Sequence, residues 1–344
     1  MNYKLYMTNS LDSVNGLSGL FNMGNTCYFN TIIQCLSNTK LLCAYLTTDE
    51  HMKVYEKKHI SDYDNFISYR LGNLLKHMWS KNGVCIPREL SDVVGDVKKI
   101  FRRGAQNDAE EVLNCMLDNI HEECKLNAIS EIQTTDSLTN NAITFWNGYI
   151  HNNYSIITDL FTGIFCNMMT CFECHNVVYK FEPFNILSIS IPEDATTLEQ
   201  CLEHFEKPEL LTDDNQVRCE KCGKNTDTIK RIFIWEISSV LIIHLKRFKM
   251  NGKYAEKNNT SIHFPIVDLT LDKNYHPNYK REYKYNLYGI VNHSGDVGSG
   301  HYFAYCQNFM DNNWYQYNDS SVSIIHNFNS SVKSEGYIFM YVKE

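Results

Sequence analysis

The sequence lacks long apolar runs, clusters of basic residues and internal repeats. Its most apolar tract, residues 240–245, is far shorter than the roughly 20 residues that cross a bilayer. The first fifteen residues contain no apolar core of signal-peptide length, and no segment recurs with the period of about 20 to 50 residues that marks solenoids and propellers. We therefore expect a soluble protein of the cytoplasm or nucleus that works away from membranes.

Positive charge is also scarce, since the net charge of the 344 residues is −8 at pH 7. Surfaces that bind nucleic acid need clustered lysine and arginine, so a nucleic acid is a poor candidate for the partner, and a basic protein surface is a better one. Apolar residues make up 43% and charged residues 21%, as in ordinary globular proteins. The length allows two or three domains, or one large domain with subdomains.

Cysteine, in contrast, is abundant, with thirteen residues. A secreted disulfide scaffold is disfavoured in a chain of this length without a signal peptide, so we expect most thiols to be reduced. Four of them form two C-x-x-C pairs, Cys171 with Cys174 and Cys219 with Cys222. Each pair suits half of a tetrahedral zinc shell, and four sulfurs close it. We predict one structural zinc ion that joins two distant β-hairpin tips, with His175 as a bystander and no organic cofactor.

Helical patterns precede β patterns along the chain. Residues 30–121 are mainly helical, with a clear buried stripe within 106–123, and the polar stretch 126–144 reads as a loop. Beyond it, segments rich in aromatic and β-branched residues alternate with turn residues, as strands do, with one short helix in 196–205. Such segregation predicts an α+β protein with a largely antiparallel sheet.

Cys27 lies where a polar turn meets a helical pattern. Asn22, Gly24, Asn25 and Thr26 are turn formers, and the apolar residues of 28–36 have helical spacing, which places Cys27 at a helix N-terminus. Unpaired N–H groups and the helix dipole favour an anion there, and the thiolate is the nucleophilic form of cysteine. Because many cysteines are only small buried hydrophobic residues, other features must decide between the two readings.

A thiol nucleophile needs a base, and His301 is the best candidate. It follows the glycine-rich turn 295–300 and opens a predicted strand, whereas a residue such as His244 is explained as a half-buried strand position. Asn318 and Asp319 end the next predicted strand, within reach of a histidine at the head of its neighbour. Either would fix the ring and its tautomer, and the chain order Cys, His, Asn/Asp is that of thiol proteases.

Six ordered segments resemble motifs of ubiquitin-specific proteases, the papain-like deubiquitinases. "GLFNMGNTCYFNTIIQCL" resembles their Cys box, and "YGIVNHSGDVGSGHYFAYC" with "WYQYNDSSV" resembles their His box. The other four, in chain order, are "QNDAEEVLNCMLDNIHEE", "FNILSISIP", "LIIHLKRF" and "GYIFMYV". The resemblance covers about residues 16–343 and implies one catalytic domain, 16–344, after an extension of residues 1–15.

The implied domain has a papain-like cysteine protease fold shaped like a hand. A helical thumb, about residues 16–160, would carry Cys27, and a β-sheet palm, about 241–344 with contributions from earlier segments, would carry His301. Zinc-ribbon β fingers, about 161–240, would hold the body of ubiquitin, whose C-terminal tail would run between thumb and palm.

The resemblance also implies an activity, thiol-dependent hydrolysis of the isopeptide bond after the C-terminal glycine of ubiquitin. Cys27 would attack the carbonyl carbon, and His301 would take the thiol proton and later serve the leaving amine. Asn318 matches the third triad position, which is Asn or Asp in the family, and Asp319 is the second candidate. Asn22 matches the side-chain donor of the oxyanion hole.

Two further residues match positions that bind the ubiquitin tail. Asp108 matches an acidic residue that pairs with a tail arginine, and it is equally a helix N-cap candidate. Gly300 and the loop before it would leave room for the tail glycines. Two departures concern the fit of this channel: residues 106–108 read QND where the family usually has two glutamines before the aspartate, and Val112 replaces a common aromatic residue.

The expected partners are ubiquitin and ubiquitinated proteins, acted on by a monomer. A protease for another ubiquitin-like modifier would use the same mechanism and stays open. A catalytically silent ubiquitin-binding scaffold is a second alternative, although such relatives usually lack the nucleophile or the histidine, and both are present here. A nucleic-acid-binding zinc-ribbon protein is disfavoured by the net charge.

Overall fold

The computed structural model describes residues 14–128, 136–251, 254–276, 279–328 and 335–344. All but the last two residues of the predicted extension 1–15 lie outside this description. No helix in these ranges is long and apolar enough to cross a bilayer.

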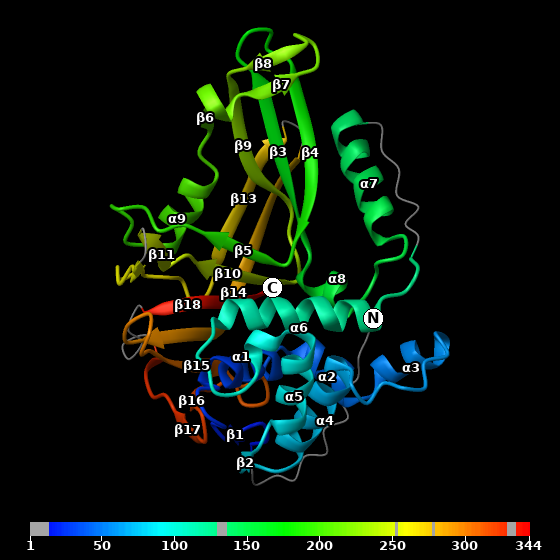
Figure 1. Ribbon diagram of the computed structural model, residues 1–344, viewed down its shortest axis with the longest axis vertical. Helices are drawn as coiled ribbons and strands as arrows, with labels where there is room; N and C mark the ends of the chain where they lie inside the picture. The colour runs from blue at the N-terminus through cyan, green and yellow to red at the C-terminus, as the bar shows by residue number, and fades with distance from the viewer. Residues whose placement is uncertain (1–13, 129–135, 252–253, 277–278, 329–334) are drawn as a thin grey trace.

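The first half of the chain is helical, as predicted, and α1 to α6 gather in the lower part of the molecule (Figure 1). Every residue of the first helix, α1, is buried, because it runs through the middle of this part. The helices are α1 (Cys27–Ser37), α2 (Lys40–Thr47), α3 (Glu50–Lys57), α4 (Ile67–Ser80), α5 (Arg88–Val97), α6 (Ala109–Cys124), α7 (Ser137–Ile150) and α8 (Ile156–Phe161), with a 3-10 turn η1 (Lys99–Phe101). Two short parallel strands, β1 (Gly19–Leu20) and β2 (Val84–Cys85), lie beside them.

The prediction of a loop over 126–144 is wrong from residue 137 onward, where α7 begins. The carboxylate of Asp136 caps this helix by accepting the N–H of Thr139 at 2.6 Å. The helix stands beside β4 (Figure 1), and Phe145 packs against Phe181 of that strand with ring centroids 6.2 Å apart. Its polar composition concealed it because few of its residues are buried. Residues 129–135 of the predicted loop lie outside the described residues.

A large sheet forms the centre of the molecule, with strand order β17-β16-β15-β14-β18-β10-β5 and β13 paired with β14. Only β5 runs parallel to its neighbour, and the other pairings are antiparallel. The strands are β5 (Ile186–Ile189), β10 (Val240–Leu245), β13 (Leu269–His276), β14 (Tyr279–Ser294), β15 (His301–Gln307), β16 (Trp314–Asn318), β17 (Ser321–Ile324) and β18 (Gly336–Lys343).

A second sheet, of order β4-β3-β9-β6, extends away from α1 to α6 and ends in the hairpin β7-β8 (Figure 1). Its strands are β3 (Gly163–Cys171), β4 (Val177–Phe184), β6 (Glu209–Leu211) and β9 (Thr228–Glu236), and the tip has η2 (Asp213–Asn215), β7 (Val217–Cys219) and β8 (Lys224–Thr226). The helix α9 (Leu198–Phe205) begins with a capping box from Thr197 and confirms the helix predicted in 196–205. A separate hairpin pairs β11 (Phe248–Asn251) with β12 (Tyr254–Lys257).

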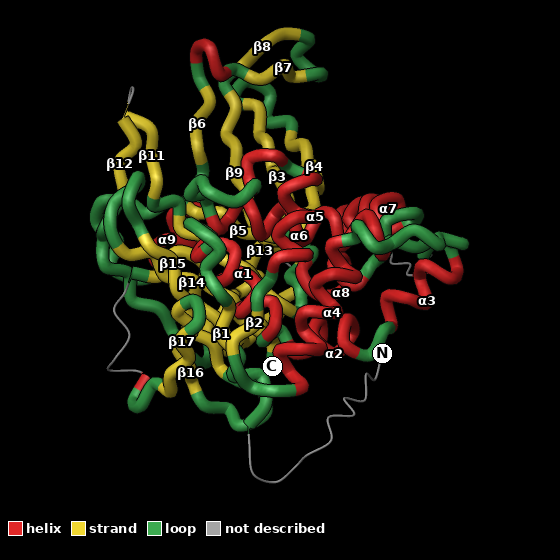
Figure 2. The backbone as a smooth tube through the Cα atoms, turned by 60° about the horizontal axis from the view of Figure 1, so that its bottom comes forward, coloured by secondary structure: helices red, strands yellow, loops and turns green. Residues whose placement is uncertain are grey.

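The separation of helices from strands confirms the predicted α+β class and is visible in both views (Figures 1 and 2). Helix α1 packs on β15 of the central sheet, where the buried sulfurs of Cys35 and Cys306 lie 3.8 Å apart. Alternate residues of β15 are buried, and these are the residues that can face the helix. The contact brings the first residue of α1 and the first residue of β15 into one region.

One buried cation joins three parts of the central sheet region. Arg247 follows β10 and is only 2% exposed. Its Nε donates to the carbonyl of Gly336 at 2.9 Å, and one Nη donates to the carbonyls of Asn258 and Thr260 at 2.9 and 2.8 Å. The planar fork of the guanidinium makes these bonds possible at once, which a lysine ammonium on a different stem cannot reproduce.

We therefore expect Arg247→Lys to lower the free energy of unfolding by about 2 kcal/mol, the usual size for lost hydrogen bonds to a charged donor. Urea unfolding followed by circular dichroism would measure the loss. The exposed neighbour Lys246 supplies the control, because Lys246→Arg removes no buried bond and should leave the midpoint unchanged. Equal midpoints for the two variants would contradict this role of Arg247.

Candidate active site

Cys27 is the first residue of α1, which confirms its predicted place at a helix N-terminus. It is 4% exposed. The preceding residue, Thr26, makes no side-chain cap to the helix. Its hydroxyl instead accepts the N–H of Met23 at 3.0 Å. The first turn of α1 therefore keeps backbone donors that no cap occupies, and such donors favour a negative charge beside them.

His301 is the first residue of β15, and Asn318 is the last residue of the neighbouring strand β16, as predicted. The imidazole Nε2 lies 2.7 Å from Oδ1 of Asn318. The same ring is hydrogen-bonded to the side chain of Cys27. Because Nε2 donates to the amide oxygen, Nδ1 is the nitrogen left for the sulfur. The structure thus brings Cys27, His301 and Asn318 together in one line of contacts.

The imidazole of His301 is strongly basic in this setting. Its hydrogen bond with Cys27 raises the pKa of His301 to about 9, against the lowering effect of burial, and the bond with Asn318 raises it further. The ordinary pKa of histidine is about 6.5. Because the folded pKa is the higher one, the stabilisation from this site is complete below about pH 6.5 and is lost as the pH rises through about 9.

Asp319, the second candidate for orienting His301, points elsewhere. Its carboxylate accepts from Nδ2 of Asn22 at 2.9 Å and from Nδ2 of Asn30 at 2.8 Å. Its backbone has a φ of +48°, in the left-handed region that Asp tolerates better than most residues. The side chain that bonds the imidazole is therefore that of Asn318, while Asp319 ties the end of β16 to the segment around Cys27.

Both the oxygen and the nitrogen of the Asn22 side-chain amide are hydrogen-bonded. Its oxygen accepts the N–H groups of Gly24 and Thr26 at 3.0 and 3.2 Å, and its nitrogen donates to Asp319. An amide nitrogen carries two hydrogens, so one N–H remains beyond the bond to Asp319. The turn that holds Asn22 leads directly into Cys27.

Asp108 caps α6, as predicted, by accepting the N–H of Glu110 at 2.7 Å. The hydroxyl of Tyr337 lies 2.6 and 2.8 Å from its two oxygens. Burial raises the pKa of Asp108, and the bonds from Tyr337 and the backbone lower it. The sequence did not single out Tyr337, whose only sign was its place in the closing motif "GYIFMYV".

Gly300 is required by a close approach that the sequence did not reveal. A Cβ at this position would lie 1.9 Å from Nε2 of His293, a buried ring that fills the space of a side chain. The carbonyl of Gly300 accepts a hydrogen bond from Nε2 of Gln106 at 3.1 Å. The loop before α6 thus contacts the loop before β15 beside the candidate site.

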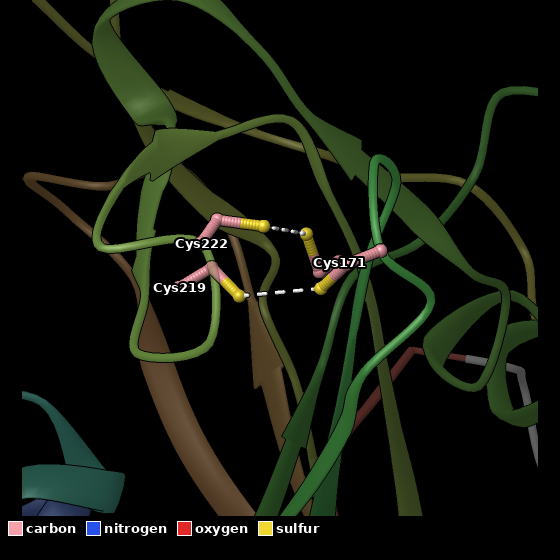
Figure 3. Close-up of side chains that lie close together, drawn as sticks. Cys171, Cys219 and Cys222 are labelled. Carbon is pink, nitrogen blue, oxygen red and sulfur yellow. Dashed lines mark hydrogen bonds between the residues drawn. The ribbon is translucent and has the colours of Figure 1, made fainter.

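The four predicted metal ligands also converge, at the far end of the second sheet (Figure 3). Their sulfurs all lie within 4.8 Å of one another, with Cys171 and Cys222 3.9 Å apart and Cys174 and Cys219 3.7 Å apart. Cys171 ends β3 and Cys174 lies in the turn to β4, while Cys219 ends β7 and Cys222 lies in the turn to β8, so the two hairpin tips meet as predicted. This group can hold a metal ion, and His175 is not part of it.

Fold and site together define the class of protein. A thiol at a helix N-terminus, an imidazole at the head of a sheet strand and an amide oxygen behind that imidazole form the arrangement of papain-like thiol hydrolases. The family model described as ubiquitin carboxyl-terminal hydrolase matches residues 18–341. The chain therefore belongs to the ubiquitin carboxyl-terminal hydrolase family, and the resemblance to ubiquitin-specific proteases is confirmed.

Individual relatives agree with this assignment. The chain is 33% identical over 340 residues to ubiquitin carboxyl-terminal hydrolase 2 of Homo sapiens, which covers 96% of this chain and 55% of that protein. It is 32% identical over 345 residues to Usp2 of Drosophila melanogaster, with 98% and 36% covered. The chain thus spans between about a third and about half the length of these curated relatives.

Solved structures show the same fold. The SAGA Ubp8/Sgf11/Sus1/Sgf73 DUB module bound to ubiquitin aldehyde matches with a TM-score of 0.78 and 26% identity, over 98% of this chain and 72% of the other. The module bound to monoubiquitin matches with a TM-score of 0.77 and 26% identity, over 98% and 71%.

The contact between Cys27 and His301 predicts a titration that can be observed directly. In wild type, nuclear magnetic resonance of the labelled imidazole nitrogens should show the pKa of His301 near 9. Cys27→Ala removes the main cause of the rise, so the pKa should fall clearly, and Asn318→Ala should lower it less. Buried His244, whose pKa burial lowers to about 4, serves as the internal control. An unchanged titration in Cys27→Ala would contradict the contact.

Proposed function

We propose that this chain is a thiol-dependent deubiquitinase that hydrolyses the isopeptide bond after the C-terminal glycine of ubiquitin. One observation carries the proposal, the hydrogen-bonded line from Cys27 through His301 to Asn318. Family membership supplies the substrate class, because the named relatives are ubiquitin hydrolases and the named structural neighbours are bound to ubiquitin or ubiquitin aldehyde.

In the proposed mechanism, Nδ1 of His301 takes the thiol proton of Cys27, whose sulfur attacks the carbonyl carbon of the terminal glycine. The imidazolium then protonates the lysine amine that leaves. A water molecule, activated by the same imidazole, attacks the acyl-enzyme and restores the thiol. Asn318 holds the ring with Nδ1 toward the sulfur throughout, and the basic imidazole suits the first proton transfer.

The negative oxygen that forms during the attack needs donors. We assign this role to the remaining N–H of Asn22 and the backbone N–H of Cys27, since both belong to the turn that opens α1 and no side chain caps this helix. A single donor of this kind is worth about 10²–10³ in rate. Asp319 contributes by fixing the amide of Asn22.

The ubiquitin tail would reach the sulfur between the loop that carries Asp108 and the loop that carries Gly300. The carboxylate of Asp108 is half-buried and already bonded to Tyr337, and a tail arginine beside it would favour its charged form. The ring of His293 behind Gly300 leaves no room for a side chain at that position.

The division of the chain into thumb, fingers and palm is part of the proposal. We propose residues 16–160 as the thumb, 161–240 as the fingers and 241–344, with earlier segments, as the palm of one catalytic domain. The chain would act as a monomer on ubiquitin and ubiquitinated proteins, in the cytoplasm or nucleus. A protease for another ubiquitin-like modifier remains the second candidate, since the site chemistry does not depend on the modifier's body.

We propose that the four-cysteine group holds one zinc ion. A tetrahedral zinc with bonds of about 2.3 Å to sulfur has sulfur–sulfur edges of about 3.8 Å. The separations of 3.7 and 3.9 Å in the two cross-hairpin pairs fit this shell. Four thiolates leave no open position for substrate, so the ion would hold the finger tips together and take no part in hydrolysis.

Labelling with ubiquitin that carries a C-terminal thiol-reactive electrophile tests the proposed activity. Wild type should form one covalent adduct, Cys27→Ala none, and Asn318→Ala should react about 10²-fold more slowly, because the base is no longer oriented. Cys115→Ala, which changes a thiol of α6, should label like wild type. A folded wild type that stays unlabelled would favour the alternative of a catalytically silent ubiquitin-binding scaffold. Competition of the labelling by other ubiquitin-like modifiers tests the second candidate, a protease for one of those modifiers.

Metal analysis of the purified protein tests the zinc site. We expect about one zinc ion per chain, lost in Cys219→Ser because a three-ligand shell binds far more weakly. His175→Asn keeps all four sulfurs and tolerates the left-handed backbone at this position, where φ is +55°, so it should retain the metal. Chelation should weaken the binding of ubiquitin more than it slows the alkylation of Cys27 by iodoacetamide. Unchanged ubiquitin affinity in metal-free protein would contradict the proposed role of the ion.

A further inference from the structure

Three consecutive side chains before α6 contact three different elements around the candidate site. Gln106 donates to the carbonyl of Gly300, which precedes β15, at 3.1 Å. Asn107 donates to the hydroxyl of Tyr28 in α1 at 3.2 Å. Asp108 accepts from Tyr337 of β18. The tail channel and the capping of α6 account for Asp108, whereas nothing in the proposed mechanism uses Asn107.

We infer that Asn107 is a positioning residue for the Cys27 nucleophile and acts through the hydroxyl of Tyr28. The inference rests on the proposed function. Asn107 stands where the family usually has the second of two glutamines. The contact with Tyr28 is therefore made by a residue in which this chain departs from the usual family sequence.

The amide of Asn107 is held in place from both sides. The residue before it is bonded to the loop of Gly300, and the residue after it is bonded to Tyr337, which is 1% exposed. Its own Nδ2 donates to the carbonyl of Ala105 at 3.3 Å as well as to the hydroxyl of Tyr28. Both hydrogens of the amide nitrogen are therefore used, which leaves one orientation for the group.

The first turn of α1 needs such a support, because the residue before it provides no side-chain cap. The turn leading into it includes Gly24 and Asn25 with φ of +102° and +54°, a conformation that packing must hold for a residue other than glycine. Side-chain bonds from neighbouring elements to residues of α1 can supply the support that a cap would otherwise give.

Two such bonds hold α1 from opposite sides. Asn30 donates to Asp319 at 2.8 Å, and Tyr28 accepts from Asn107. Successive helical residues are rotated by about 100°, so these two side chains leave the helix about 200° apart. Together they fix the rotation of the helix about its axis, and this rotation sets the direction of the Cys27 sulfur toward His301. A misplacement of about 1 Å can cost about 10²-fold in rate.

Neither the amide of Asn107 nor the phenol of Tyr28 titrates near neutral pH. Tyr28 is 2% exposed, and burial raises the pKa of its phenol above the ordinary value. The phenol therefore stays neutral over the pH range in which His301, with a pKa of about 9, changes protonation. A change in the pH profile of the thiol after removal of Asn107 then reports the geometry of that pair.

The experiment uses Asn107→Leu, which keeps the approximate size without the donor, and Tyr28→Phe, which removes only the hydroxyl. For hydrolysis of a ubiquitin conjugate, each variant should lower kcat about 5- to 10-fold with KM within about twofold, and the double variant should be no worse than either single one. Asn107→Gln keeps the amide donor and should retain most of kcat. Asn259→Leu, at an exposed amide, is the matched control.

Alkylation of Cys27 by iodoacetamide, followed on the Cys27 peptide by mass spectrometry, supplies a readout without ubiquitin. We expect Asn107→Leu and Tyr28→Phe to shift its pH profile in the same direction, and Asn259→Leu to leave it unchanged. A shifted profile in a protein that does not react with ubiquitin would reject the proposed function and keep the positioning role. Unchanged kcat and alkylation, or a lowered melting temperature alone, in an active enzyme would overturn the positioning role.

Discussion

The packing of α1 on β15 is the constraint on which the candidate site depends. Cys27 and His301 each stand at the first position of their element, so they meet only if the two elements lie together with their beginnings aligned. Further along, the sulfurs of Cys35 and Cys306 lie 3.8 Å apart, and neither residue is exposed to solvent. Close-packed side chains of this kind resist sliding by even one methylene group. The chemistry at one end of the contact is thus fixed by apolar packing in its middle.

Around this contact, the site is organised mainly by neutral amides. Asn318 accepts from the imidazole, Asn107 donates to a phenol, and Asn22 and Asn30 both donate to the carboxylate of Asp319. An amide can donate and accept at once and carries no charge, so several can surround a thiol and an imidazole without competing with them for protons. The single carboxylate of this group is held by two donors and directed away from the ring. The proton exchange is thereby left to the thiol and the imidazole.

The tip of the second sheet, at the hairpin β7-β8, cannot depend on apolar packing in the same way. The hairpin β7-β8 has three residues in each strand and buries only one side chain per strand, too little apolar area to hold its shape against chain entropy. A metal ion bound by the four cysteines would replace such a core, because the binding free energy of the ion would become folding free energy. The same molecule thus uses apolar packing where α1 and β15 must align and brings four cysteines together where the hairpin tips meet.

The sequence by itself determined what local pattern can specify: the helix that begins at Cys27, the strands that place His301 beside Asn318, and the spacing of the four cysteines. These depend on turn residues, hydrophobic period and short-range spacing. Only the tertiary structure decided that Asp319 binds amides rather than the imidazole, that His293 fills the space beside Gly300, and that α7 covers a sheet face despite its polar composition. Asp319 and its amide partners lie far apart in the chain, as do α7 and the sheet it covers, and the ring of His293 meets Gly300 only through the folding of the loop between them. Packing determines which of several chemically equivalent partners comes within reach.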